Sequence, residues 1–364
     1  GKFMEKFYVG YGHKSIGDCG STTLFTEGVS MLAAKAIQDW PLYCGQESST
    51  RYLDFSKMKI ANPVGTEKAA AIQTKWMELY NKALGELKID LTAKYPIQDG
   101  EKLEVYEKAI LARSFDISRC LLPAGMTTMV AWHTNLRQAS DHLKTMRHHP
   151  LQEVKDVAIQ MIESLKAKYP NSFGHKRYDT EEAYLEISQS EIAYMKPFEV
   201  SGVEYKSYLR HDILKRYMHI LQSRPFKAEL PHQIKSAGDM VLKFAIDFGS
   251  YRDIQRHRAV TMTQPLLTTE LGFHSWYLNN FPTAFRAQLE EEISQLVLEI
   301  NALECSDEDR QYYIGMGFQV SLEMTATIPS LVYLAELRSG ETVHESLRPI
   351  AQEFGKILQT EIPE

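Results

Sequence analysis

The strongest constraint on the fold of this chain is a repeat that relates its first half to its second half. Ser15–Asp18 (Ser-Ile-Gly-Asp) resembles Ser236–Asp239 (Ser-Ala-Gly-Asp). Further matches follow in the same order: Phe25 with Phe244, Ser30 with Ser250, Gln38 with Gln255, and Leu143–Leu151 with Ala335–Leu347. Because the matches keep their order over so long a stretch, the sequence predicts two diverged copies of one module in tandem.

The repeat divides the chain into a first module (residues 1–170), a connection (171–204) and a second module (205–364). Apolar residues at helical spacing predict helices over most of both modules. These are Thr66–Leu87, Val105–Ser114, Thr127–Met146, Leu151–Lys168, Tyr205–Gln222, Ala284–Leu303 and Val343–Leu358, with a buried helix running into a loop over Gly28–Tyr52. Asp239–Phe248 fits a strand or the start of a buried helix. This balance favours a helix-rich α+β fold over a doubly wound sheet.

Composition excludes several classes of partner. The 364 residues are 44% hydrophobic and 24% charged, with a formal net charge of −6. No overall basic field attracts nucleic acid or a membrane surface, so a local group of arginines must hold any phosphate. No apolar run reaches the roughly 18–20 residues of a membrane span, and no signal peptide is visible. We expect a cytoplasmic protein, and the abrupt start at Gly1 suggests that natural residues precede it.

The four cysteines, Cys19, Cys44, Cys120 and Cys305, are widely spaced. They form neither a CxxC pair nor a Cys/His ligand pattern, so we expect no metal site. Free thiols in a reducing compartment are the simplest reading.

The sharpest local signal is Arg256-His257-Arg258, which follows an apolar stretch. Three side chains that are or can become cationic are costly near a core unless they meet an anion. Guanidinium groups bind phosphate through two parallel hydrogen bonds, which suits a nucleotide or a dinucleotide cofactor. A solvated charged loop explains this string equally well when it is taken alone.

The second signal is the polar run Gln46–Tyr52 (Gln-Glu-Ser-Ser-Thr-Arg-Tyr). Its hydroxyls, its amides and Arg51 suit a loop that wraps an anionic ligand, and Glu47 can accept a hydrogen bond. The alternative is a capped turn in which Glu47 pairs with Arg51. Arg119, ahead of Cys120–Pro123, and Arg338, after an apolar stretch, are further candidates; a surface ion pair and a helix C-terminus are their ordinary explanations.

Taken together, these strings resemble the flavin-dependent thymidylate synthases. That family carries an Arg-His-Arg motif, a Glu…Ser-x-Arg-Tyr segment soon after it, an upstream Gly-His-x-Ser element (here Gly12–Ser15), an Arg-x-x-Leu-Pro element and a helix ending in Leu-Arg. The resemblance covers Gly12 to about Tyr169 in one pass and about His232 to Phe354 in another. It is closest to the long, tandem members of the family.

The two copies depart from the family pattern in opposite places. The first copy reads Asp39-Trp40-Pro41 where Arg-His-Arg is expected, but keeps the Gln46–Tyr52 segment. The second keeps Arg256–Arg258, but reads Gln264–Thr269 (Gln-Pro-Leu-Leu-Thr-Thr) in the following slot. Family active sites lie between subunits, where the Arg-His-Arg of one subunit faces the Ser-x-Arg loop of another. The resemblance therefore implies one complete composite site between the two modules and one reciprocal site that is dead.

Residue roles are carried over by the same resemblance. Arg338 would sit by the pyrimidine ring and favour its ionised form as the catalytic residue. The substrate-binding residues would be Glu47, Ser48, Ser49, Thr50, Arg51, Arg119, Asp253 and Arg256. The flavin-binding residues would be Ser30, Glu47, His142, Arg256, His257 and Arg258. Arg147 matches Arg338 within the repeat and would belong to the dead site.

The implied reaction is the methylation of dUMP at C5 with methylenetetrahydrofolate, in which FAD reduced by NADPH supplies the hydride. Asp253 stands where the family usually has Gln, which leaves open a related flavoenzyme that modifies another pyrimidine nucleotide. A non-catalytic nucleotide-binding homologue is the third reading. Thr50 replaces a common Gly, and Thr327-Ile328-Pro329 stands where the family has an Asn-x-Arg flavin contact. The family's homotetramer maps onto a homodimer of tandem chains with pseudo-tetrameric symmetry.

Overall fold

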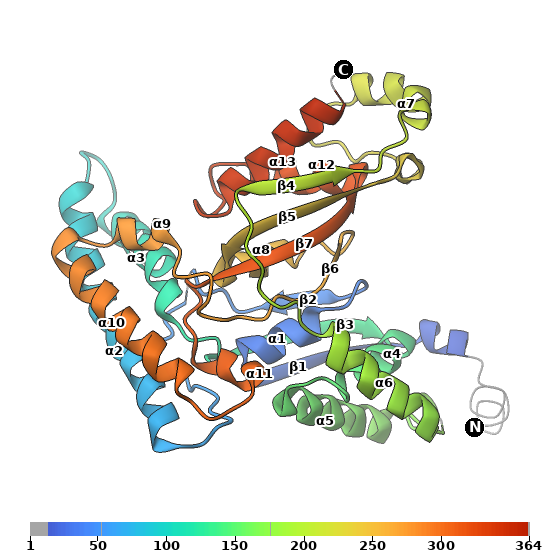
Figure 1. The fold of residues 1–364 in the computed structure, drawn as a ribbon, viewed down its shortest axis with the longest axis horizontal. Coiled ribbons are helices and arrows are strands. Elements are labelled where there is room, and N and C mark those ends of the chain that lie inside the picture. The colour runs from blue at the N-terminus through green and yellow to red at the C-terminus, as the bar shows by residue number, and fades with distance from the viewer. Residues whose placement is uncertain (1–13, 52, 175, 363–364) are drawn as a thin grey trace.

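The computed structural model describes residues 14–51, 53–174 and 176–362. It is a mixed α+β structure with two separate antiparallel sheets, one in each half of the chain (Figure 1). Gly12, His13 and Tyr52, which belong to the predicted motifs, lie outside the described residues. No helix in the described ranges is long and apolar enough to cross a membrane.

The first half builds a three-stranded sheet in the order β1-β3-β2. Its elements are η2 (Lys14–Cys19), β1 (Ser21–Ser30), α1 (Met31–Gln38), β2 (Cys44–Glu47), α2 (Glu67–Lys94), α3 (Leu103–Ser118), η3 (Arg119–Leu121), β3 (Thr127–Asn135), α4 (Leu136–Met146) and α5 (Gln152–Lys168). The prediction for α2 is confirmed, because the Thr66 side chain accepts a hydrogen bond from the backbone N–H of Ala69 as its N-cap.

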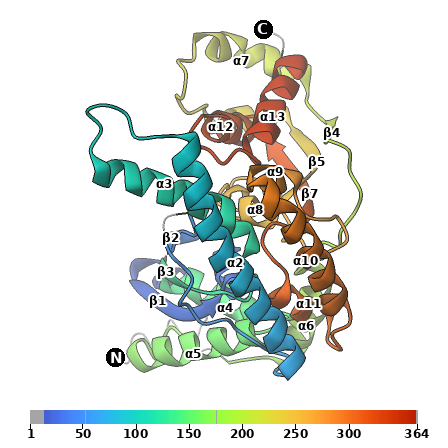
Figure 2. The ribbon, with the colours of Figure 1, turned by 90° about the vertical axis from the view of Figure 1, so that its left-hand side faces the viewer.

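The second half repeats this order of elements around a four-stranded sheet, β4-β5-β7-β6. It comprises β4 (Val203–Ser207), α7 (His211–Ser223), η4 (His232–Ala237), β5 (Asp239–Asp247), α8 (Phe248–Ile254), β6 (Thr261–Met262), α9 (Ser275–Asn280), α10 (Thr283–Asn301), α11 (Asp307–Arg310), η5 (Gln311–Tyr313), β7 (Gln319–Thr327), α12 (Ile328–Arg338) and α13 (Arg348–Glu361). The long helices α2 and α10 lie side by side (Figure 2).

Three secondary-structure predictions are wrong. Thr127–Asn135 is strand β3 and not the start of a helix, because it pairs along its length with β1. Gly28–Ser30 closes a strand before the buried helix α1, and Val203–Ser207 is a strand before α7. Each strand is held by a partner distant in sequence, which local periodicity does not detect. The connection is also not featureless, since it holds α6 (Asp179–Ile192).

The residues that precede equivalent helices change the alignment of the two halves. Ser30 caps α1 and Asp247 caps α8, so Ser30 corresponds to Asp247 and not to Ser250. Asn135 and Thr327 precede α4 and α12, which are equally long, so Arg338 corresponds to Met146 rather than Arg147.

The two halves pair directly through equivalent backbone segments. Pro123 and Gly315 form an antiparallel bridge, flanked by N–H to O bonds from Ala124 to Ile314 (2.9 Å) and from Met316 to Leu122 (2.9 Å). A Cβ on Gly125 would lie 2.6 Å from the carbonyl oxygen of Tyr312, so this close approach requires glycine. The junction fixes how β2 and α8, which carry the candidate site, face each other.

Candidate functional site

The predicted loop of the first half and the Arg-His-Arg segment of the second half meet at the junction. Arg252, one turn before Arg256, donates to the Thr50 hydroxyl at 3.2 Å and to the Glu47 carboxylate at 2.5 Å. Arg51 lies near enough to Arg338 to disfavour its charge. The predicted loop of the first half therefore lies against the residues that precede the Arg-His-Arg segment of the second half.

Glu47 does not face a ligand, although the sequence predicted that it would. Its side chain is 2% exposed and accepts hydrogen bonds from Lys35 (2.8 Å), Gln38 (2.8 Å) and Arg252. Burial alone would raise the pKa of Glu47, but Arg252 and Lys35 outweigh it and lower the pKa to about 2. Glu47 is a charged anchor at the junction.

Asp253 lies at the centre of a group of arginines. Its carboxylate is 3.8 Å from Arg256 and 4.0 Å from Arg338. Burial would raise its pKa, but Arg119, Arg338, Arg256 and Arg252 together hold it below the ordinary value. Arg252 is also paired with Glu47, and Arg119 lies 3.9 Å from Asp247, so among the described residues Arg256 and Arg338 are the two cations that share Asp253 without another carboxylate in contact. Two cations beside one ionised carboxylate leave an excess of positive charge that suits an anionic ligand.

Arg338 and His257 are joined within this group. Arg338 donates from Nε to Nε2 of His257 at 2.9 Å and from Nη2 to the carbonyl oxygen of Asp253 at 3.0 Å. Burial, then the charge of Arg338, lowers the pKa of His257 to about 3. A neutral His257 can accept this hydrogen bond, and its acceptance fixes the guanidinium of Arg338.

Arg51 and Arg119 are both held by the protein. Arg51 donates to the two carboxylate oxygens of Asp116 at 2.6 and 3.1 Å, with its side chain 25% exposed. Arg119 is 2% exposed and binds Ser250 (3.0 Å) and Tyr277 (3.2 Å). The predicted nucleotide contact of Arg119 is therefore absent here: it supports α8 from behind, whereas Arg51 lies at the surface of the site.

Arg256 is exposed and Arg258 is half-buried. The side chain of Arg256 is 49% exposed. Arg258 lies over the Tyr43 ring at 4.8 Å, and its buried Nε has no hydrogen-bond partner among the described residues. Ser48 and Ser49 are half-buried in the loop beside them. Guanidinium and hydroxyl groups of this kind can donate hydrogen bonds to an anion.

Two residues predicted to contact flavin are buried and have protein partners. Ser30 is fully buried, and its hydroxyl donates to Glu153 at 2.5 Å while capping α1. His142 is 3% exposed, bonds to the carbonyl of Ile37 and stacks on Trp40 at 4.8 Å. Both side chains are buried inside the first half, and among the described residues only Nδ1 of His142 lacks a hydrogen-bond partner within this pair.

The reciprocal side of the junction is covered by the connection. The backbone of Met195 makes hydrogen bonds to Gln264 (2.7 Å) and Leu266 (2.8 Å), in the segment that corresponds to Gln46–Tyr52 of the first half. Glu182 on α6 accepts hydrogen bonds from Arg147 and His148, each at 3.0 Å. The connection therefore makes hydrogen bonds to both halves, and the dead reciprocal site stays a prediction.

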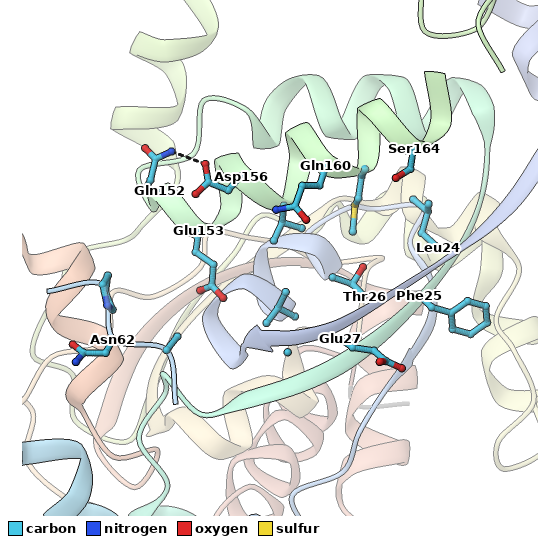
Figure 3. A pocket seen from close by; sticks show the side chains of 16 residues that line it. Leu24, Phe25, Thr26, Glu27, Asn62, Gln152, Glu153, Asp156, Gln160 and Ser164 are labelled. Carbon is cyan, nitrogen blue, oxygen red and sulfur yellow. Dashed lines mark hydrogen bonds between the residues drawn. The ribbon is translucent and has the colours of Figure 1, made fainter. Parts of the chain in front are cut away.

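The hollows of the structure differ in charge. One of about 690 Å³ lies between β1 and α5 and carries Glu27, Glu153 and Asp156, so it does not suit a phosphate (Figure 3). Another, of about 270 Å³, borders the site and is lined by Arg51, Arg113, Asp116, Glu345 and Arg348 among others. In the described ranges no group of His, Cys, Asp and Glu is arranged to hold a metal ion.

Sequence reasoning missed Lys35, Asp116, Asp247 and Arg252. Asp247 caps α8 and accepts from Ser346 (2.5 Å) and Tyr277 (2.9 Å). Gln38 lies eight residues after the N-cap of α1, and Gln255 lies eight residues after the N-cap of α8. In this alignment Lys35 and Arg252 occupy equivalent positions of the two helices. A charged residue on a buried helix at the same place in both copies was the signal available in the sequence.

Comparison with known proteins gives two kinds of similarity. The chain is 24% identical to a UPF0159 protein of Chlamydia muridarum over 97% of this chain and 78% of that protein. It is 21% identical to the UPF0159 protein Ta1429 of Thermoplasma acidophilum, over 96% and 84%. The family described as "Thymidylate synthase complementing protein" matches residues 2–171. The first half of the chain is therefore similar to the Thy1 family, the flavin-dependent thymidylate synthases.

Proposed function

We propose that the chain is a flavin-dependent thymidylate synthase-like enzyme with one composite site between its halves. It would methylate dUMP at C5, with methylenetetrahydrofolate as the one-carbon donor and NADPH as the reductant. The observation that carries this proposal is the arginine group around Asp253, to which both halves contribute. The family match over residues 2–171 supports it for the first half, and the repeated order of elements extends it to the second.

FAD fits the site in part. Arg256 and Arg258 have the exposed guanidinium and the unpartnered buried Nε that a diphosphate can satisfy. Ser30 and His142 do not contribute, and Thr327–Pro329 adds no charged group. When bound, the flavin supplies the hydride. The chain's own part is to hold the nucleotide phosphate beside Arg51 and Arg256, and to stabilise negative charge on the pyrimidine with Arg338.

The test is reconstitution of the purified protein with FAD, followed by an assay for dTMP from dUMP, methylenetetrahydrofolate and NADPH. Uptake of flavin, seen as yellow colour in the absorption spectrum, together with dTMP formation would support the proposal. Protein that stays colourless and inactive would favour a non-catalytic nucleotide-binding homologue.

Asp253 supports a second candidate, a flavoenzyme that modifies another pyrimidine nucleotide. Its side chain is 19% exposed and held ionised, so it only accepts hydrogen bonds. An acceptor at this place favours a base that presents an amino group. Turnover of dCMP in preference to dUMP would support this candidate over the first.

The proposed assembly is a homodimer in which four modules take a pseudo-tetrameric arrangement. Light scattering after gel filtration should give twice the mass of the chain at micromolar concentration. A monomer at that concentration would contradict the assembly without touching the composite site, since both parts of that site belong to one chain.

A further inference from the structure

The side chain of Glu47 is fully occupied by the protein just before the nucleotide loop, defined here as residues 48–51. Oε1 accepts from Nη2 of Arg252, and Oε2 accepts from Nζ of Lys35 and Nε2 of Gln38. The side chains of Lys35, Glu47 and Arg252 are 1%, 2% and 7% exposed. Glu47 therefore acts on the site through the loop that follows it.

Arg252 is the member of this cluster that also contacts the loop. Its Nη1 donates to the Thr50 hydroxyl at 3.2 Å, while Nη2 donates to Glu47 at 2.5 Å. One planar guanidinium from the second half thus binds both Thr50 in the loop and Glu47 just before it. An ammonium group has no such fork and can serve one of these points at a time.

Lys35 completes a set of two cations and one anion. Gln255 on the second half donates to the carbonyl oxygen of Lys35 at 3.1 Å, which ties the ends of α1 and α8 together. Burial lowers the pKa of Lys35 to about 8, so at neutral pH the cluster carries one positive charge in excess, in contact with the loop at Thr50 and near Arg256. A bound anion above the loop would offset this charge.

We propose that Arg252, supported by Lys35, is a positioning residue that holds the nucleotide loop in its binding shape through Glu47 and Thr50. This inference rests on the proposed function for the identity of the ligand, but the order of the loop itself is testable without ligand. No atom of Arg252 needs to touch the nucleotide.

Three variants separate the two contacts. Thr50→Val removes the hydroxyl and leaves every buried charge paired, so it should fold. Arg252→Lys keeps a cation for Glu47 and loses the fork. Arg252→Met leaves Glu47 with Lys35 alone. The matched control is Lys75→Met, because Lys75 on α2 and Glu299 on α10 also join the two halves (2.6 Å), away from the loop.

The first readout is hydrogen exchange of the Arg51 and Leu53 amides, which donate to Ser49 within the loop, and of the Ser48 amide, which donates to Met129 on β3. The second is the Kd for dUMP. Thr50→Val and Arg252→Lys should each speed loop exchange and raise the Kd about tenfold, as the loss of one charged hydrogen bond implies. Arg252→Met should raise the Kd about a hundredfold or more. Lys75→Met should change neither by more than about twofold.

Unchanged loop exchange and unchanged Kd in both Thr50→Val and Arg252→Lys would overturn the positioning role. An equal loosening of the loop in Lys75→Met would do the same, because it would show a general weakening of the junction. If the unaltered protein binds no dUMP, the proposed function fails, whereas loop exchange still decides the role of Arg252.

Discussion

Arg338 donates a hydrogen bond from Nε to Nε2 of His257 at 2.9 Å. The last residue of α12 is thereby fixed to the middle residue of the Arg-His-Arg segment. A protonated His257 has no lone pair at Nε2 and cannot accept this bond. Burial and the neighbouring charge of Arg338 lower the pKa of His257 to about 3, so the bond persists at neutral pH.

Replacing Arg338 with glutamine should lower kcat for the pyrimidine reaction by about a hundredfold, because a charge that stabilises the developing negative ring is lost. Glutamine can still donate to His257, so the fold should be retained. Steady-state kinetics with far-UV circular dichroism would check this. A variant that keeps full kcat would show that Arg338 is not at the reacting base.

Replacing Arg256 with alanine should weaken the binding of FAD or dUMP about tenfold or more, because its exposed guanidinium is placed to receive phosphate. The control is Arg147→Ala, which breaks a pair with Glu182 on the covered side. Isothermal titration would measure both affinities. If Arg147→Ala were the more damaging, the composite site would be on the opposite side of the junction.

Asp253→Gln would install the residue usual in the family. A neutral amide both donates and accepts hydrogen bonds. Removal of the carboxylate charge leaves the surrounding arginines free to interact with an anionic ligand. We expect tighter binding of dUMP and a preference shifted away from dCMP, measured as the ratio of the two Kd values. A ratio unaffected by the change would remove Asp253 as a determinant of the base.

The free energy of unfolding should fall as the pH drops below about 6.5. Burial lowers the pKa of His142 and His149 to about 4, and that of His257 to about 3. The unfolded chain takes up protons on these residues from about pH 6.5 downward, while the folded protein does not until its own pKa is reached. Stability is therefore lost across this window as pH falls.

Urea unfolding from pH 7.5 to 4.5 would measure that slope. His149→Asn should reduce the slope of unfolding free energy against pH by up to about 1.4 kcal/mol per pH unit, the value for one proton. The variant should still fold, because Asn can accept the hydrogen bond from the N–H of Leu151. The exposed His219 changed to Asn is the control. An equal slope in His149→Asn and the unaltered protein would contradict the assignment.

Glu182→Gln should loosen the connection over the reciprocal side. Arg147 and His148 lose their charged partner, at a cost of about 1 kcal/mol in unfolding free energy, and the amides of α6 should exchange faster. Nucleotide titration should still give one site per chain. Two sites per chain in the unaltered protein would show that the covered side is open in solution.

The sequence by itself determined the features that depend on local chemistry. Thr66 predicted the start of α2, and helical spacing predicted α5 and α10. The two modules with complementary halves of one site stay a prediction from the order of short motifs. Arg256 and Arg51 were found because arginines beside hydroxyls are recognisable without knowledge of their partners.

The tertiary structure decided everything that depends on pairing over distance. β3 was mistaken for helix because its partner β1 lies about a hundred residues earlier in the chain. Glu47, Ser30 and His142 were assigned to ligands, and burial gave them protein partners instead. Residue type shows which charge a side chain can carry, but only the packed junction determines whether that charge meets solvent, a ligand or another side chain.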